Sequence, residues 1–520
     1  MNDRALSSPH PIESPTVRTA SNGTIDAVLL AMLTAGYWFA AIRSAATRPL
    51  WMDEVLSKWT ARLPDISAIW DALNRGSDFS PPPHYLLLHQ IIALGGDNVL
   101  ALRLPSIAAI YIAAFAAFVL MRRYYGVPAS LLAMALCLAG GLLPFAVQAR
   151  PYALVAACFA SALVVWDSTK NEQPSWRRTA ALFALLVMTV SLHFYAVLLA
   201  TSVGLMELIW TVKHRRIRWI YMFAIGLACI SILLWLPLMQ HISALNSGDT
   251  DAAGYYARPR AASLPIVYAL LMVGYDASII ATPLTVMITA IVGWIGVKIW
   301  FNGRSEIPRT NACNLDIIIG VTCAIPLFVF AFSALVTHTF NLRYVVAAAI
   351  GLSLLTARLI AVTRNSTAYS YFVIAASIGL FLHASIAELP LTPRERALAM
   401  VEQAPRNLPI VTGNALRFIE LRESASASVT ARLTYLKSPA GTVSPDPTNE
   451  NQLMRWLAIN PDLAIADIAP FANNNPRFVL FYDEGATDLL PAQLQARGDR
   501  INILKQDGDA YLAEIDSPSR

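Results

Sequence analysis

Long apolar segments recur along residues 25–386, and they constrain the fold more than any other feature of the sequence. A helix needs about 20 mostly apolar residues to cross the hydrocarbon core of a bilayer. The chain is 56% hydrophobic and only 14% charged, whereas soluble proteins carry roughly 25% charged residues. This composition excludes a soluble enzyme and predicts a mostly α-helical, polytopic membrane bundle of about eleven spans. The predicted spans are 25–45, 99–120, 128–147, 151–166, 179–193, 195–211, 217–237, 280–300, 315–336, 345–361 and 369–386.

The charge balance changes near residue 389. Residues 1–385 contain 26 lysines and arginines against 17 aspartates and glutamates, whereas residues 386–520 contain 13 against 17. The C-terminal segment has the charge density of a water-soluble domain, which we predict at 389–520. The net charge of the whole chain is +5, but lysine and arginine collect in the short cytoplasmic loops of membrane proteins. The excess therefore reports topology, and we exclude a nucleic-acid partner.

The two ends of the chain differ from the predicted transmembrane domain at 25–388. Residues 1–24 are polar, rich in Ser and Pro and without a signal-peptide pattern, which predicts a disordered cytoplasmic tail. At the other end, short apolar runs alternate with helical patterns, which predicts a small α/β domain. The predicted strands are 408–412, 433–436, 464–468, 478–482, 501–505 and 510–515, and the predicted helices include 414–421 and 489–496.

The basic residues predict the orientation of the bundle. Alternating the spans from a cytoplasmic N-terminus brings the basic loops to one side, as the positive-inside rule requires. The first outer loop, 46–98, and the C-terminal domain then lie outside. The basic residues assigned to the cytoplasmic side are Arg122, Arg123, Lys170, Arg177, Arg178, Lys213, Arg215, Arg216, Arg218, Lys298, Arg304, Arg309, Arg358 and Arg364.

Two adjacent acids, Asp53 and Glu54, follow the first span within a few residues. A carboxylate held at a half-desolvated interface is a better proton acceptor, which is the property that a general base needs. A solvated pair of loop acids fits the spacing equally well. Further along the same loop, 59–73 has helical spacing of apolar residues and predicts an amphipathic helix on the membrane surface or a spacer helix.

Two arginines lie in short outer turns, Arg150 before Pro151 and Arg343 before Tyr344. An arginine in such a position generally meets an anion, either a lipid headgroup phosphate or a phosphate-bearing substrate. Because both turns are on one side, we predict that they form one site.

Histidine and tyrosine side chains also lie on the outer side. His193 is in another outer turn, and Tyr85 and His89, with His84 before them, are where the first outer loop leads back into the membrane. A single histidine in apolar sequence is more often a hydrogen-bonded core residue than a ligand. Glu207 and Asp276 are further candidates inside or near the membrane, although Glu207 is close enough to the Lys213–Arg218 cluster to pair with it.

Several chemistries are not indicated. The five cysteines show no spacing typical of zinc, and no nucleotide-binding loop follows a strand. We therefore predict no cofactor, no direct use of a nucleotide sugar and a reaction without a metal.

The order of several motifs resembles the bacterial protein O-mannosyltransferase and aminoarabinose transferase superfamily, whose members are multispanning C-type glycosyltransferases. The resemblance covers residues 25–360. The motifs that carry it are Asp53-Glu54, Pro82-Pro83-His84-Tyr85, Leu102-Arg103-Leu104-Pro105-Ser106, Ala149-Arg150-Pro151-Tyr152-Ala153-Leu154, His193-Phe194 and Arg343-Tyr344.

The resemblance implies a transferase of the bacterial inner membrane that takes a sugar from a polyprenyl phosphate at the outer face. The acceptor would be a glycan, a lipid or a protein arriving from that side. Asp53 is implied as the general base and Glu54 as its partner in shaping the catalytic site. Arg150 and Arg343 would hold the phosphate. The further residues implied in substrate binding are His84, Tyr85, Tyr152, His193 and Tyr344.

An already activated phosphate leaving group needs only charge stabilisation, so one base and in-line attack would invert the anomeric carbon. Two other classes remain open. A lipid or polysaccharide transporter would spread charges through the depth of the membrane, whereas these candidates gather at outer turns. A noncatalytic subunit would bind the lipid-linked sugar and recruit a partner through its C-terminal domain.

Overall fold

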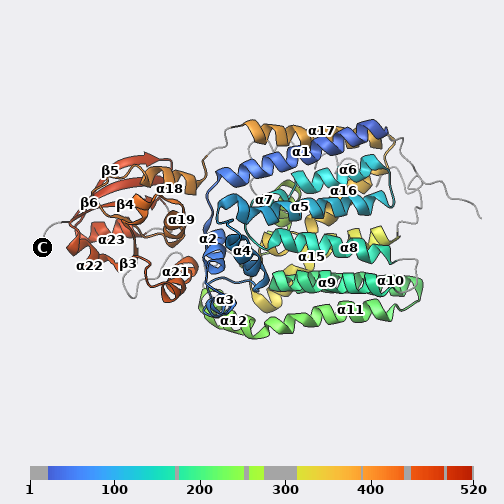
Figure 1. The fold of residues 1–520 in the computed structure, drawn as a ribbon, viewed down its shortest axis with the longest axis horizontal. Helices are drawn as coiled ribbons and strands as arrows, with labels where there is room; N and C mark the ends of the chain where they lie inside the picture. The colour runs from blue at the N-terminus through green and yellow to red at the C-terminus, as the bar shows by residue number, and fades with distance from the viewer. Residues whose placement is uncertain are drawn as a thin grey trace, which may run out of the picture.

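The computed structural model describes residues 22–169, 175–250, 257–274, 313–387, 391–437, 447–484 and 489–517, with side chains described outside 246–250 and 273. Two regions lie end to end along the long axis of the molecule (Figure 1): a helical region at 22–387 and a smaller region with a β-sheet at 391–517. The predicted N-terminal tail falls almost entirely outside the described residues, and so does the predicted boundary at 388–389.

Long, roughly antiparallel helices form the larger region. Within the described residues, six helical segments are long and apolar enough to cross a membrane, so the protein is a multi-pass membrane protein. The long-axis helices are α1 (Gly23–Thr47), α5 (Val99–Arg122), α6 (Val127–Ala139), α7 (Leu143–Ala146), α8 (Tyr152–Ser168), α9 (Trp176–Leu192), α10 (Val197–His214), α11 (Trp219–Ile230), α12 (Leu236–Thr250), α13 (Ser263–Val273), α15 (Cys313–Phe332), α16 (Ala348–Ala361) and α17 (Ser366–Ile386).

Each predicted span within the described residues coincides with a helix, and two of them differ in detail. The span 128–147 is broken between α6 and α7 at Gly140-Gly141. A Cβ at Gly141 would collide with the carbonyl of Leu271, so the absence of a side chain lets α13 pack directly on the break. The span 217–237 continues through a 3-10 turn into α12. The predicted span 280–300 lies outside the described residues.

Helix α5 lies at the centre of the bundle. Asn98 caps it by accepting the N–H of Ala101. Its buried face is rich in alanine, including Ala109, Ala113 and Ala117. Small residues let helices approach closely in a membrane, where packing rather than water exclusion drives their association.

Three short helices follow α1 before the chain enters α5: α2 (Met52–Ala61), α3 (Ile66–Asn74) and α4 (Pro83–Ala93). The predicted amphipathic helix at 59–73 is therefore wrong as a single element. The chain turns at Pro64, and Asp65 caps α3 by accepting the N–H of Ala68 at 2.8 Å. Its expected position on the membrane surface is also wrong for the Trp59 end, where the indole packs against Trp456 of the C-terminal region at 5.3 Å.

The C-terminal region is built on a mixed six-stranded sheet in the order β3-β2-β1-β4-β6-β5. The first four strands in that order are parallel, whereas β6 runs antiparallel to both β4 and β5. The predicted α/β character and the six predicted strands are confirmed. The strands are β1 (Ile410–Thr412), β2 (Leu433–Lys437), β3 (Ile465–Asp467), β4 (Arg477–Asp483), β5 (Arg500–Asp507) and β6 (Ala510–Asp516), and the helices are α18 (Pro393–Val401), α19 (Ala415–Ser424), α20 (Ala427–Thr430), α21 (Pro447–Ile459), α22 (Ile468–Asn474) and α23 (Leu490–Arg497).

Candidate active site

Asp53 and Arg343 meet although 290 residues separate them in sequence. Asp53 is in the first turn of α2, and Arg343 is in the short helical turn Leu342–Tyr344 before α16. Arg343 Nη1 donates to Asp53 Oδ2 at 2.7 Å, and each side chain is 21% exposed. The same Nη1 lies 3.4 Å from the hydroxyl of Tyr152. This ion pair is partly exposed, in contrast to the buried pairs around it.

Glu54, the neighbour of Asp53, is completely buried. Arg103 of α5 binds it with two parallel hydrogen bonds, Nε to Oε1 at 2.7 Å and Nη2 to Oε2 at 2.6 Å. The N–H groups of Trp51 and Ala149 donate to the same carboxylate. Both oxygens are thus occupied by protein donors, and the geometry suits a residue that positions α2 rather than one that touches substrate.

Arg103 extends this connection to the end of α1. Its Nη atoms donate to the carbonyls of Ala45, Arg48 and Pro49 at 2.7–3.1 Å. A planar guanidinium can serve a carboxylate and several carbonyls at once. Glu54 and Arg103 together join α1, α2 and α5 directly beneath Asp53.

Arg150 is buried against an acid that the sequence analysis did not select, Asp78. Its Nη1 donates to Asp78 Oδ2 and to Ser57 Oγ, and its Nη2 donates to Asp78 Oδ1 at 3.2 Å. It also donates to the backbone carbonyl of Asp53 at 2.9 Å, while its Nη2 lies 4.0 Å from the Asp53 carboxylate. Arg150 therefore supports the backbone that carries Asp53, and its charge is matched by Asp78.

The electrostatics of this cluster keep the Arg150–Asp78 pair charged. Burial alone would raise the pKa of Asp78, but the charge and hydrogen bonds of Arg150 outweigh it and hold that pKa below its ordinary value. Beside them, burial and the charge of Arg150 lower the pKa of His84 to about 3. The His84 ring is thus neutral, and its Nε2 lies 3.1 Å from the carbonyl of Ala149.

Aromatic rings line the side of the site formed by α8 and the turns after α9 and α15. The ring of His193 lies 5.5 Å from those of both Tyr152 and Tyr344. Tyr344 stacks on Tyr195 at 4.0 Å with nearly parallel planes. Such rings offer flat apolar faces, and the tyrosines add polar hydroxyl groups.

The nine site residues named from the sequence occupy one neighbourhood. Tyr85 completes the set, since it is fully buried next to His84 at a ring distance of 5.6 Å. Asp78 and Ser57 were not predicted from the sequence. Asp78 could have been found by asking which acid matches Arg150, because a buried arginine needs a charged partner. Glu207 lies elsewhere, in a buried pair with Arg218, and Asp276 lies outside the described residues.

The helical membrane bundle, with its C-terminal α/β region, has the fold of the C-type membrane glycosyltransferases. Two solved structures support this assignment, both of ArnT, the aminoarabinose transferase, from Cupriavidus metallidurans. The apo form matches with a TM-score of 0.58 and 12% identity over 94% of this chain and 98% of that chain. The form bound to undecaprenyl phosphate matches with a TM-score of 0.53 and 12% identity over 95% and 98%. The resemblance seen in the sequence is confirmed at the level of the fold.

An oligosaccharyltransferase from Archaeoglobus fulgidus also matches, with a TM-score of 0.46 and 9% identity over 88% of this chain and 69% of that chain, which is too distant to support a conclusion. No protein-family model and no curated protein matches the sequence.

Proposed function

We propose that the protein is a membrane glycosyltransferase that moves a sugar from a polyprenyl phosphate to an acceptor. The accessible Asp53–Arg343 pair carries this proposal, because it combines a candidate base with a candidate phosphate-binding residue. Both lie beside an aromatic wall, by which we mean the rings of Tyr152, His193, Tyr195 and Tyr344. The shared fold with ArnT, which has been solved with undecaprenyl phosphate bound, supports a lipid-linked donor.

Arg343 is the residue that we assign to the donor phosphate. A phosphate that binds Arg343 competes with Asp53 for the same guanidinium, so donor binding releases the Asp53 carboxylate. Asp53 then accepts the proton of the acceptor hydroxyl or amine. The acceptor atom bonds to the anomeric carbon while the bond from that carbon to the phosphate oxygen breaks, which inverts the configuration. Arg343 stabilises the charge on the departing phosphate.

Arg150 receives a different role from the one expected from the sequence. Asp78 and Ser57 already occupy its Nη atoms, so binding a phosphate there would cost those buried contacts. We assign Arg150, Glu54 and Arg103 to positioning Asp53. Tyr152, His193 and Tyr344 would contact the sugar, and His84 and Tyr85 would support the turn at Ala149.

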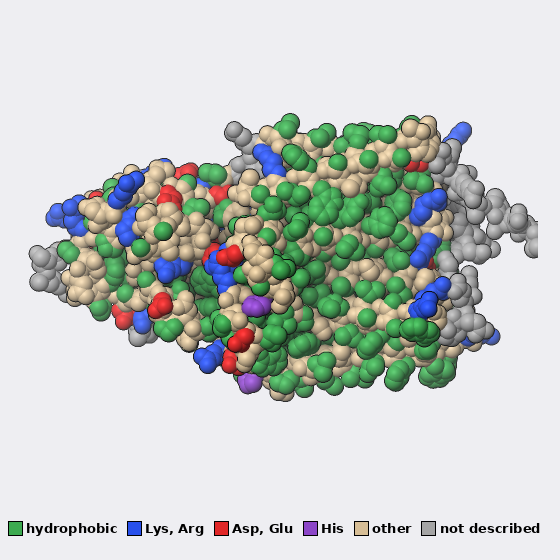
Figure 2. Space-filling model, in the orientation of Figure 1, with side chains coloured by type: hydrophobic (Ala, Val, Ile, Leu, Met, Phe, Trp, Pro, Cys, Tyr) green, Lys and Arg blue, Asp and Glu red, His purple; other side chains and the backbone are tan. Residues whose placement is uncertain are grey.

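The proposed site is at the outer face of the bacterial inner membrane, with the C-terminal domain at 389–520 in the periplasm. Hydrophobic side chains cover the visible face of the bundle, and lysine and arginine gather at the end remote from the C-terminal region (Figure 2). The positive-inside rule assigns such an end to the cytoplasm. The test is a reporter that works only in the cytoplasm, fused after residue 400. Activity of this reporter would overturn the orientation.

Two experiments test the function. First, the lipid, lipopolysaccharide and glycoprotein fractions of wild-type and gene-deletion cells are compared by mass spectrometry for one missing sugar. The missing sugar and the fraction that lacks it identify the donor sugar and the acceptor. Second, the purified protein is given that polyprenyl-phosphate sugar and acceptor, and release of polyprenyl phosphate is measured. Donor binding without turnover would favour a noncatalytic subunit, and movement of the intact lipid-linked sugar across vesicles would favour a transporter.

A further inference from the structure

The C-terminal region contacts the helical region at two segments that carry acids of the site, the start of α2 with Asp53 and the segment before α4 with Asp78. Its helices α19 and α21 face α2 and the segment before α4 (Figure 1). Glu420 of α19 is only 6% exposed, and its Oε1 accepts the backbone N–H of Met52 at 3.3 Å. Met52 is the first residue of α2 and immediately precedes Asp53. A carboxylate at the N-terminus of a helix accepts a hydrogen bond from a free N–H group and interacts favourably with the helix dipole.

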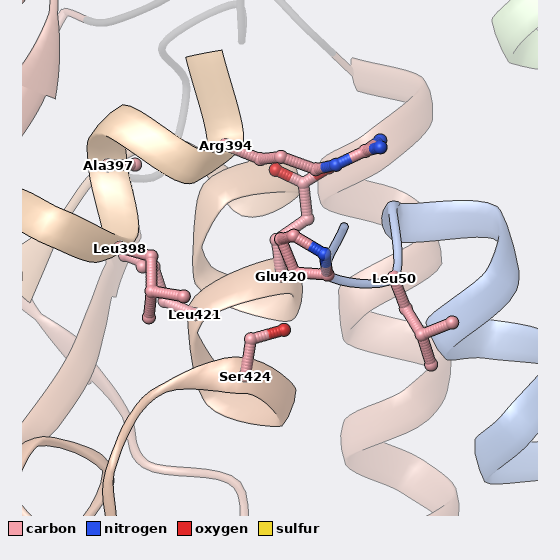
Figure 3. A pocket seen from close by; sticks show the side chains of 8 residues that line it. Leu50, Arg394, Ala397, Leu398, Glu420, Leu421 and Ser424 are labelled. Atoms are coloured by element: carbon pink, nitrogen blue, oxygen red, sulfur yellow. The ribbon is translucent and has the colours of Figure 1, made fainter. Parts of the chain in front are cut away.

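Arg417 holds Glu420 in place from within α19, since its Nη1 donates to Glu420 Oε2 at 2.8 Å. Figure 3 shows Glu420 beside Arg394 of α18, and Leu50, which comes just before α2, lines the same small pocket. Only a small hollow separates the two regions at this point. The carboxylate is therefore fixed from the C-terminal side and reaches across to α2.

One turn further along α19, Glu423 binds the other end of α2. Its carboxylate pairs with Lys58 at 2.9 Å and accepts the indole N–H of Trp59 at 2.8 Å. Arg62 lies 3.4 Å away on the same oxygen as Trp59. The two acids of α19 together hold α2 from its first residue to its last turn, which fixes the direction of the helix that presents Asp53.

A second, independent contact reaches the loop that carries Asp78. The side-chain amide of Gln452 on α21 donates to the carbonyls of Gly76 and Ser77, and the indole of Trp456 donates to the carbonyl of Ser77 at 3.0 Å. Gly76 has a φ of +79°, a conformation that side chains rarely adopt. Ser77 immediately precedes Asp78, the partner of Arg150.

We infer that the C-terminal region is part of the active-site scaffold, with Glu420 and Gln452 as positioning residues for Asp53 and Asp78. This inference rests on the proposed function. In both contacts, a buried side chain from the C-terminal region binds the backbone of the residue directly before an acid. A domain that only recruits an acceptor would not require buried contacts at these two peptides. A small displacement of a catalytic group is costly, because reaction rates depend steeply on alignment.

The test uses full-length Glu420→Ala and Gln452→Ala, with Glu514→Ala as the matched control. Glu514 is on β6 of the same region and pairs with Arg477 rather than with α2. We expect kcat to fall by about tenfold to a hundredfold in the first two variants, with KM for the polyprenyl-phosphate sugar changed by less than about threefold because Arg343 is intact. The control should keep the wild-type kcat.

Hydrogen exchange of peptides that contain residues 52–56 and 76–79 gives a second readout. Exchange should rise near Met52 in Glu420→Ala and near Asp78 in Gln452→Ala, and it should stay unchanged in the control. Wild-type exchange in both variants would overturn the inference, and so would raised exchange with an unchanged kcat. A wild-type protein without turnover would overturn the proposed function instead, and the exchange measurement would still decide whether these contacts hold the two loops.

Discussion

Arginine–carboxylate pairs lie at both ends of the helical bundle, and they differ in access. At the end remote from the C-terminal region, Glu207 is fully buried and receives Arg218 Nε at 2.8 Å and the Trp166 indole at 2.9 Å. The Arg218 guanidinium also lies 3.8 Å from the Trp210 ring and donates to Thr169. Every side of this pair is covered by protein.

The pair at the other end, Asp53–Arg343, keeps 21% of each side chain exposed and has an aromatic wall beside it. The same kind of ion pair thus serves a different purpose at each end of the bundle. A closed pair ties helices together, because separating it would leave a buried charge, whereas an open pair can exchange its partner for a ligand. The predictions below test that distinction.

The largest effect is expected for Asp53→Asn at the open end. Asparagine keeps the shape of the side chain but cannot accept a proton, so transfer should fall by about 10²–10⁴. Expression and unfolding temperature should stay near wild type, and donor binding should be kept or tightened, because Asp53 no longer competes with the phosphate for Arg343. The measurement is release of polyprenyl phosphate by the purified variant, and a near-wild-type rate would show that Asp53 is not the base.

At the closed end, Glu207→Ala should act on stability instead. Removing one partner of a buried pair costs about 3–5 kcal/mol, because Arg218 is left without its counter-charge. Thermal unfolding in detergent should report this loss, while kcat of the fraction that remains folded should match the wild type. A variant with normal stability and lost turnover would reverse the roles assigned to the two ends.

Arg343→Ala should weaken donor use by about 1.5–3 kcal/mol, which is the value of a charge-assisted hydrogen bond in a partly desolvated site. Lysine should recover only part of it, because a point charge cannot reproduce the geometry of a guanidinium. The measurements are the donor Kd and kcat/KM. If both survive the alanine change, the phosphate binds elsewhere.

The smallest effect, at most about 2 kcal/mol between pH 7 and pH 5, concerns His84, which is neutral in the folded protein because its pKa is about 3. An unfolded histidine binds a proton near pH 6.5, so between pH 6.5 and 3 the unfolded state carries one proton more than the folded state. Stability should therefore fall as the pH is lowered through this window, by at most about 1.4 kcal/mol per pH unit. His84→Gln should lose this component when unfolding temperatures are compared at pH 7 and pH 5.

The parts of the site that the sequence predicted are those with a local signal. Asp53 follows the first span, and Arg343 and Arg150 interrupt apolar sequence in short turns, so the alternation of spans brought them to one side. The direction of the Arg150 side chain had no such signal. It depends on Asp78, which is 72 residues away in a loop without periodicity.

The fold shows the same division between local and distant information. The period of the apolar residues predicted the helices and the strands, because each is set by neighbours along the chain. It did not predict that Trp59 meets Trp456. An apolar helix face requires a cover, but its sequence cannot tell lipid from a protein surface that comes 397 positions later.

The distance of 290 residues between Asp53 and Arg343 also has a consequence for biosynthesis. Chains emerge from the ribosome N-terminus first, so Asp53 is delivered to the membrane long before its partner. The contact of α2 with Arg343 can form only later. Its contact with Glu420 forms later still, since Glu420 is 368 residues beyond Met52. A chain that stops short of residue 343 would hold nearly all the aromatic wall and the Arg150–Asp78 pair, yet lack the charge that we assign to the donor phosphate. Catalytic competence would thus be acquired only after Arg343 has been made, and the contact of α2 with the C-terminal region only after Glu420.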